Sequence, residues 1–322
     1  MQALLRWLDP LLNPLACLPP APDASYRPEN ADALLKRLEA MLQHQLRYAL
    51  SGEQRSILRG QGLDFADLRE YMPGDDIRKI DWSVFARTLT PHVREYHEEK
   101  QLTLWLTVDL TPSMRFGRQK SKLRHALDLT GLLGLLAQKG NHKLGAMLIT
   151  GNDTRIIPPK TGYVHLQHIT KTLLDTANQP ISGPLPNDPL PDACQKLAHL
   201  AQKNSTVLFL SDFLSTSTQW KSPLGQLSRQ TKLVYLVLQD SVEAQVPADI
   251  GLLSVTDPET GQISAIDTNN PSFRHAYGQQ ARQQMQQTLQ ILTQTGKAAM
   301  APTDQDPISI VAALVQEGQA TR

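Results

Sequence analysis

The sequence predicts an α/β fold in which a mostly parallel sheet carries helices on both faces. From about residue 101 onward, short apolar runs alternate with longer amphipathic segments, which is typical of parallel strands joined by helical crossovers. Leu102–Val108 is the first such run, and leucines recur at helical spacing in the segment 121–138 that follows it. A change of character before residue 101 predicts a separate, smaller subdomain.

Three segments follow from these patterns. Residues 1–28 are rich in proline, and charges interrupt their apolar residues. Residues 29–100 begin with an amphipathic helix, about Ala31–Leu50, and continue into a region where 17 of the 46 residues from 55 to 100 are charged. Because that region does not alternate cleanly, we expect short strands and loops forming a β-rich subdomain. Residues 101–322 form the α/β domain.

The other elements of the α/β domain are predicted in chain order. Further strands are expected at Lys143–Thr150, Arg155–Ile157, Thr206–Leu210 and Lys232–Leu238, with helices near 121–138, 164–176, 192–203, 279–294 and 307–316. A hairpin is expected near Ser254–Ile266, because Asp257-Pro258-Glu259-Thr260-Gly261 has the composition of a turn.

Composition and charge exclude several classes of function. The net charge of +1 gives no electrostatic reason to expect nucleic acid or an anionic membrane as the main partner. Two cysteines, Cys17 and Cys194, are too few for a disulfide framework or a four-cysteine zinc site. The first 28 residues lack the uninterrupted apolar stretch of a signal peptide or a membrane span. We therefore expect a cytoplasmic protein with no membrane span.

The sequence also lacks the common catalytic motifs. It contains no Walker loop, no glycine-rich dinucleotide fingerprint and no HExxH helix. The nine histidines are scattered, with no pair at metal-ligand spacing backed by a carboxylate. We expect a protein that is not an enzyme.

The informative motif follows the first predicted strand. Asp109, Thr111 and Ser113 stand on the loop after Leu102–Val108, and Asp212 follows the strand Thr206–Leu210. Ligands of open parallel sheets gather at the carboxyl ends of strands, so these oxygens are expected at one edge. Such a set suits Mg²⁺, which keeps much of its hydration. The alternative is a turn in which Asp109 accepts hydrogen bonds from backbone N–H groups.

A longer set of motifs resembles domain-of-unknown-function family number 58. The resemblance covers roughly residues 30–317, and its central signature is highly specific. The motifs are Gly60-Gln61-Gly62-Leu63-Asp64-Phe65, the run from Leu68 to Trp82, Ala86-Arg87, Val93-Arg94-Glu95-Tyr96, Ser211-Asp212-Phe213 and Asp257-Pro258-Glu259-Thr260-Gly261.

This resemblance implies a von Willebrand factor A-like fold and a partnership with a MoxR-type AAA+ ATPase. It implies no established catalytic activity. It also places a metal-ion-dependent adhesion site at Asp109, Thr111, Ser113 and Asp212, with Mg²⁺ as the metal and Mn²⁺ as a possible substitute. The adhesion-site pattern has a further threonine on a middle loop, and the matching position here is Asn187.

Three hypotheses for the function remain open. The first is a non-enzymatic adaptor whose cation binds an acidic group on the AAA+ ATPase or on an unknown client, in assembly or chaperone-like work. The second is a metal-dependent hydrolase using Asp109 and Asp212. The third is a structural member of the family whose site has lost its metal.

Two structural expectations accompany these hypotheses. The charged residues of the run from Leu68 to Arg87 are expected either to pair with one another or to form a docking surface for the ATPase, with Trp82 as a core anchor. Asp109 and Asp212 are expected to repel each other without metal, so that replacing either one changes stability little.

Overall fold

The computed structural model describes residues 30–50, 65–73, 75–77, 80–96, 101–118, 120–151, 153–179, 188–214, 219–244, 251–256 and 263–320. The chain divides into two compact units. The larger unit comprises Met1–Tyr48 and Leu102–Arg322, and the smaller one comprises Ala49–Gln101. The predicted N-terminal segment, residues 1–28, lies outside the described residues.

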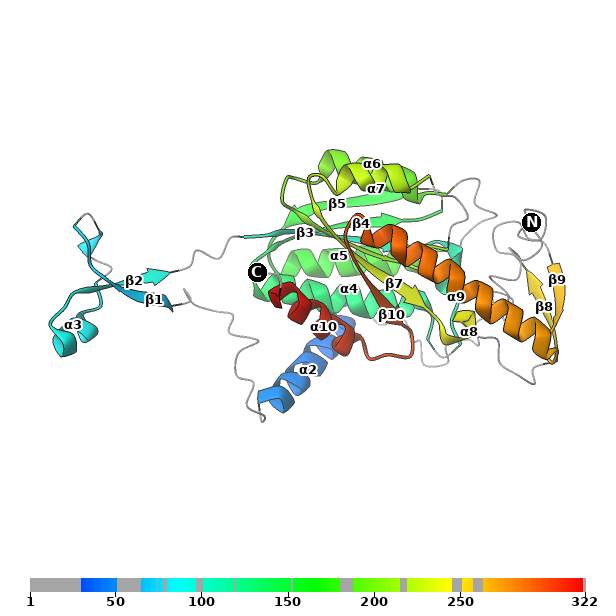
Figure 1. Cartoon of the computed structure of the whole chain (residues 1–322), viewed down its shortest axis with the longest axis horizontal. Helices are drawn as coiled ribbons and strands as arrows, with labels where there is room; N and C mark the ends of the chain where they lie inside the picture. Colours follow the sequence, from blue (N-terminus) through cyan, green and yellow to red (C-terminus); the bar gives the residue numbers. More distant parts are fainter. Residues whose placement is uncertain are drawn as a thin grey trace. The chain divides into compact units, whose positions relative to one another are not determined.

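A six-stranded sheet forms the centre of the larger unit (Figure 1). Its strands in spatial order are β10 (Lys297–Pro302), β7 (Lys232–Gln239), β6 (Thr206–Ser211), β3 (Thr103–Asp109), β4 (Lys143–Ile149) and β5 (Thr154–Lys160). Neighbouring strands are parallel except for β5, which pairs antiparallel with β4 at one edge. The strand order reverses between β3 and β6, and such switch points are where open α/β sheets place their ligand sites.

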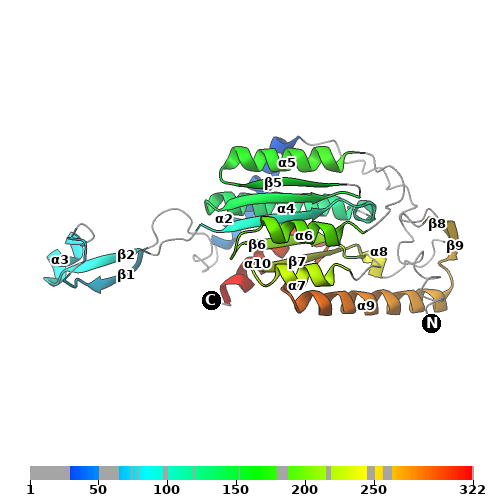
Figure 2. The same ribbon diagram turned by 90° about the horizontal axis from the view of Figure 1, so that it is seen from above.

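Helices cover both faces of this sheet (Figures 1 and 2). One face is covered by α2 (Ala31–Leu50), α4 (Lys122–Lys139), α5 (Tyr163–Ala177) and α10 (Pro307–Ala320), and the other by α6 (Leu190–Leu200), α7 (Lys221–Leu227) and α9 (Pro271–Thr293). The strands alternate accordingly, because Leu106 and Val108 of β3 enter the first core while Trp105 enters the second. This architecture confirms the predicted von Willebrand factor A-like fold class.

Helix α2 packs into the core of the larger unit. Leu34, Leu35 and Leu38 are fully buried in the core that α4 and α5 share. The approach to α4 is close, since a Cβ atom added to Gly131 would lie 2.4 Å from Leu38 Cδ1. Arg37 Nη2 also lies 2.7 Å from Asp128 Oδ1 of α4.

The position of α2 corrects the predicted domain boundary, which joined this helix to the charged subdomain in one segment, 29–100. The helix instead belongs with the α/β domain, and the second unit begins at Ala49. An amphipathic stripe predicts that a helix has a buried face, but it does not identify the surface that covers that face.

The smaller unit contains an antiparallel pair, β1 (Phe65–Glu70) and β2 (His92–Tyr96), and one short helix, α3 (Trp82–Thr88). Asp81 caps α3, because its Oδ1 accepts a hydrogen bond from Ser83 N at 2.9 Å. The expectation that Trp82 anchors a core is wrong for the described residues, since it is 61% exposed and packs edge-on against Phe85.

Two further findings concern the predicted elements. The hairpin near Ser254–Ile266 is present as β8 (Leu252–Thr256) and β9 (Ile263–Asp267), although its turn lies outside the described residues. No helix in the described part of the chain has the length and apolar character needed to cross a membrane.

The burial of α2 yields a test of the revised boundary. We expect Leu38→Ala to lower the free energy of unfolding by about 2–5 kcal/mol, because it removes a fully buried side chain and leaves a cavity beside Gly131. Lys36→Ala, at an exposed position of the same helix, is the matched control and is expected to change stability by less than about 0.5 kcal/mol. Equal urea denaturation curves for the two variants would contradict the packing described here.

Candidate functional site

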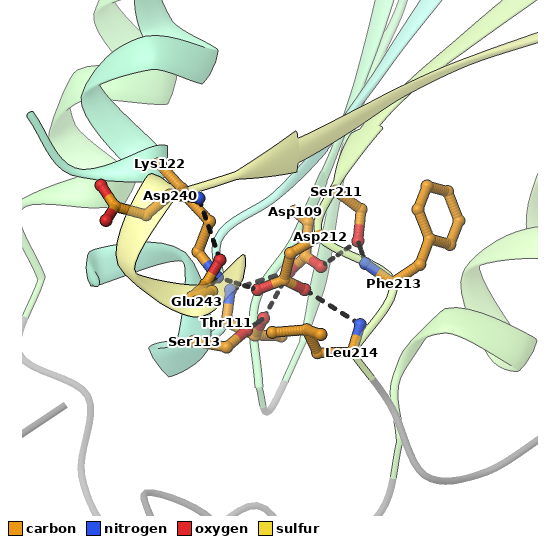
Figure 3. Close-up of polar contacts among 10 residues, drawn as sticks. All are labelled: Asp109, Thr111, Ser113, Lys122, Ser211, Asp212, Phe213, Leu214, Asp240 and Glu243. Carbon is orange, nitrogen blue, oxygen red and sulfur yellow. Dashed lines mark hydrogen bonds and ion pairs between the residues drawn. The ribbon is translucent and has the colours of Figure 1, made fainter. Parts of the chain in front are cut away.

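The candidate site lies where β3 and β6 end. These strands are parallel neighbours, and Val108 of β3 pairs with Leu210 of β6. Both strands end at the same edge of the sheet, so Asp109, the last residue of β3, lies near Ser211 and Asp212 at the end of β6 (Figure 3). The predicted convergence of the two strand ends is therefore present.

Asp109 accepts hydrogen bonds on both carboxylate oxygens. Its Oδ1 accepts from Thr111 N at 2.9 Å and from Thr111 Oγ1 at 2.6 Å. Its Oδ2 accepts from Ser211 Oγ at 2.6 Å, a bond that joins the two strand ends (Figure 3). The bond from Thr111 N is the turn hydrogen bond that the sequence offered as the alternative to a binding site. Asp109 therefore forms this turn and also lies at the candidate site.

Ser113 stands on a short 3-10 helix, η3 (Pro112–Arg115), and Thr111 is the N-cap residue that precedes it. Pro112 suits the first turn of such a helix, because its fixed backbone angle favours the turn and its missing N–H leaves no donor unsatisfied. The helix brings Thr111 Oγ1 to within 3.3 Å of Ser113 Oγ. Two hydroxyl oxygens and one carboxylate are thereby grouped within five residues of sequence.

Asp212 has a partner that the sequence did not predict. Its Oδ2 lies 2.7 Å from Nζ of Lys122, the first residue of α4, and its Oδ1 accepts from Leu214 N at 3.2 Å. Lys122 also forms an ion pair with Glu243 Oε1 (Figure 3). The Lys122 side chain is 0% exposed, and both carboxylates are buried.

A reciprocal cap holds Glu243 in place. The short helix α8 (Ser241–Ala244) begins after Asp240, whose Oδ1 accepts from Val242 N at 3.0 Å. Glu243 Oε2 in turn accepts from Asp240 N at 3.0 Å, as in a capping box. One oxygen of Glu243 thus caps α8, and the other binds Lys122.

Phe213 fixes the loop that carries Asp212. Its φ of 50° lies in the left-handed region, which a bulky side chain adopts only when its surroundings enforce it. The ring is buried against Tyr235, Trp220 and Phe209, with centroids 5.8, 6.1 and 6.5 Å away. Phe213 N also donates to Ser211 Oγ at 3.0 Å. Each residue of the Ser211-Asp212-Phe213 motif therefore has a structural role at this edge.

The two aspartates are in different electrostatic environments. Burial first, and then the charge of Asp212, raise the pKa of Asp109 to about 6, although the hydrogen bonds from Ser211 and Thr111 act to lower it. Asp212 has the ammonium of Lys122 beside it. The expectation that either carboxylate can be removed with little loss of stability therefore fits Asp109 alone. Removing Asp212 would leave the buried Lys122 with one ion-pair partner fewer.

Lys122 stays protonated in this environment. Desolvation by burial acts to lower the pKa of Lys122, but the charges of Asp212 and Glu243 and the hydrogen bonds to them outweigh that effect and raise it above its ordinary value. The amine is therefore a permanent cation at neutral pH.

The structure brings together four of the five predicted ligand residues: Asp109, Thr111, Ser113 and Asp212. Asn187 lies outside the described residues. The described residues contain no group of three or more His, Cys, Asp or Glu side chains that could hold a metal ion. A cation at this edge would therefore depend on the two carboxylates, the two hydroxyls and water, a set of hard oxygen donors that fits Mg²⁺.

Sequence reasoning missed Lys122 and Glu243. A lysine in the first turn of a helix ordinarily lies in solvent, and the positive helix N-terminus disfavours it there, so nothing marked it as buried. The spacing of Asp240 and Glu243 was the available signal for Glu243, because an acceptor three residues after a capping residue is typical of a capping box.

Comparison with known families identifies the chain. The family model described as "Protein of unknown function DUF58" matches residues 67–287, more than half of the sequence. The chain belongs to this family. Curated relatives include an uncharacterized protein of Mycobacterium bovis and two uncharacterized proteins of Mycobacterium tuberculosis. Each is 28% identical to the DUF58 chain over 250 residues, which cover 77% of both proteins.

Solved structures similar to this DUF58 protein include a conserved hypothetical protein, BatB, from Bacteroides thetaiotaomicron. That structure is 13% identical, covers 68% of this chain and 98% of its own, and gives a TM-score of 0.42. A von Willebrand factor type A structure from Catenulispora acidiphila is 7% identical, covers 71% of this chain and 43% of its own, and gives a TM-score of 0.38.

The raised pKa of Asp109 predicts a pH dependence of stability in metal-free protein. Between its ordinary pKa of 3.8 and about 6, the folded state binds the Asp109 proton more tightly than the unfolded state does. Its contribution to stability is therefore greatest at low pH and declines as the pH rises through this window, by up to about 3 kcal/mol for a shift of about two pKa units.

The measurement is urea denaturation of wild type and Asp109→Asn from pH 4 to 7 in the presence of chelator. The difference between the free energies of unfolding of the two proteins at each pH cancels the contributions of the other carboxylates. We expect Asp109→Asn to gain stability relative to the wild type as the pH rises. A difference that stays constant, or that moves in favour of the wild type, would show that burial does not raise the pKa of Asp109.

Proposed function

We propose that this DUF58 protein is a non-enzymatic, cytoplasmic interaction module that binds an acidic group of a protein partner through a divalent cation. The observation that supports it is the convergence of Asp109, Thr111, Ser113 and Asp212 from two neighbouring strand ends. Mg²⁺ is the cation best suited to these donors, and Mn²⁺ has similar preferences. An open coordination position would accept a carboxylate of the partner.

The proposed partner is a MoxR-type AAA+ ATPase, with an unknown protein as the client of the pair. This part of the proposal rests on the resemblance of the signature from Leu68 to Trp82 to the DUF58 family. Binding of an acidic residue through a cation needs no catalytic base. The proposal is therefore compatible with the hydrogen bonds that both Asp109 oxygens already accept.

That bonding also argues against catalysis. A pKa of about 6 would suit Asp109 as a general base, and this favours the alternative function of a metal-dependent hydrolase. Both Asp109 oxygens, however, already accept hydrogen bonds from Thr111 and Ser211. Lys122 is held as an ammonium and so has no lone pair for a proton. Turnover of a phosphoester, ester or peptide that disappears in Asp109→Ala would favour the hydrolase instead.

Metal binding is tested by titration calorimetry. Wild type is expected to bind Mg²⁺ and Mn²⁺ at millimolar concentration or below, and Asp109→Ala and Ser113→Ala are expected to lose that binding. A hundredfold excess of metal over its dissociation constant stabilises the wild type by about 2.7 kcal/mol, and the variants lack this gain. Asp175→Asn, an exposed carboxylate on α5, is the control that keeps it. Absence of binding to the wild type would favour the structural, metal-free member of the family.

A further variant tests the position of Asn187 by the same calorimetry. If Asn187 occupies the middle-loop position that the family resemblance implies, Asn187→Thr is expected to tighten Mg²⁺ binding, because it restores the hydroxyl of the adhesion-site pattern. Unchanged affinity in this variant would show that another residue takes that place.

Partner binding is tested by pull-down of the purified MoxR-type ATPase of the same organism. We expect capture in Mg²⁺, loss of capture in chelator, and loss with Asp109→Ala but not with Asp175→Asn. Equal capture with and without metal would contradict the cation-bridged mode while keeping the partner. No capture under either condition would contradict the partner.

A further inference from the structure

Lys122 is placed where a lysine is unfavourable on two counts. It is the first residue of α4, so its charge lies at the positive end of the helix dipole. Its side chain is fully buried, so its ammonium has lost the hydration that stabilises it in water. Among the residues that the structure describes, the ion pairs with Asp212 and Glu243 offset these costs, and the ring of Phe116, whose centroid lies 5.9 Å from Nζ, adds to their effect.

The charges of the four side chains Lys122, Asp109, Asp212 and Glu243 do not balance. Asp109, Asp212 and Glu243 contribute three negative charges when ionised, and Lys122 contributes one positive charge, so the group carries a net charge of −2. One divalent cation would bring this total to zero. The lysine and such a cation would both draw on Asp212, because Lys122 Nζ already lies 2.7 Å from its Oδ2.

We propose that Lys122 is a built-in cation that holds the site together when no metal is bound and competes with a divalent cation for Asp212. The competition rests on the proposed function, whereas the role in the metal-free protein does not. With the lysine present, Asp212 is partly neutralised, so the metal binds more weakly and exchanges. Without the lysine, the carboxylates depend on the metal for their neutralisation.

This role differs from a purely structural one in its effect on metal affinity. A lysine that only fills space and pairs charge in the core would, on removal, lower the stability of the protein with and without metal alike. A lysine that competes for Asp212 would, on removal, increase the affinity for the metal. The two readouts are therefore the stability of chelator-treated protein and the dissociation constant for Mg²⁺ and Mn²⁺.

Three variants of the full chain separate charge from competition. Lys122→Met removes the cation and leaves a net charge of −3. Lys122→Met with Glu243→Gln keeps the wild-type total of −2 but frees Asp212 from the lysine. Glu243→Gln alone keeps the ion pair between Lys122 and Asp212 and lowers the total to −1. Comparison of the double variant with the wild type therefore isolates the competition for Asp212 at constant formal charge.

In chelator, we expect Lys122→Met to melt at a lower temperature than the wild type. On addition of Mg²⁺, we expect the melting temperature of Lys122→Met to rise by more than that of the wild type. Calorimetry with MgCl₂ and MnCl₂ is expected to show at least tenfold tighter binding to Lys122→Met, tighter binding to the double variant than to the wild type, and weaker binding to Glu243→Gln. If Lys122→Met does not fold, the comparison of the double variant with the wild type is the test.

The outcomes distinguish this inference from the proposed function. Binding by the double variant but not by the wild type would support competition by Lys122 and contradict metal binding by the native site. Wild-type binding with an affinity within twofold of the double variant would overturn the competition while preserving the metal site. No binding by any of the proteins would overturn both.

Discussion

The site depends on one constraint, which is that buried carboxylates must be neutralised or fully hydrogen-bonded. Three of them lie together at the carboxyl edge of the sheet, on β3, after β6 and on α8. Asp109 meets the requirement through hydroxyl and backbone donors and through a raised pKa, while Asp212 and Glu243 meet it through Lys122. The ammonium of Lys122 thereby joins the first turn of α4 to the loop after β6 and to α8.

The same constraint explains the Ser211-Asp212-Phe213 motif. Ser211 bridges to Asp109, Asp212 receives the lysine, and Phe213 anchors the turn in an aromatic cluster despite its left-handed backbone. These contacts hold the charged side chain of Asp212 in a fixed position at the end of the strand. Preorganisation of this kind suits a site that recognises a partner, because less ordering is needed when the partner binds.

Sequence patterns predicted the core strands and most helices, because apolar runs and helical periodicity are direct consequences of burial. They failed where the deciding contact is tertiary. The leucines of α2 showed a buried face but not α4 as its cover, and β10 was missed because Lys297–Pro302 contains alanine and proline in place of β-branched residues. Asp109, Thr111, Ser113 and Asp212 were recognisable because strand ends share an edge, whereas Lys122 is decided by partners 90 and 121 residues away.

We propose that these oxygens hold a divalent cation beside Lys122. A crystal of the full chain grown in MnCl₂ and measured for anomalous scattering of manganese tests this. We expect a manganese peak at bonding distance from the hydroxyls of Thr111 and Ser113, with Lys122 still buried against Glu243. Crystals that diffract well enough to resolve these side chains, yet show no manganese at this edge, would contradict the proposed cation site.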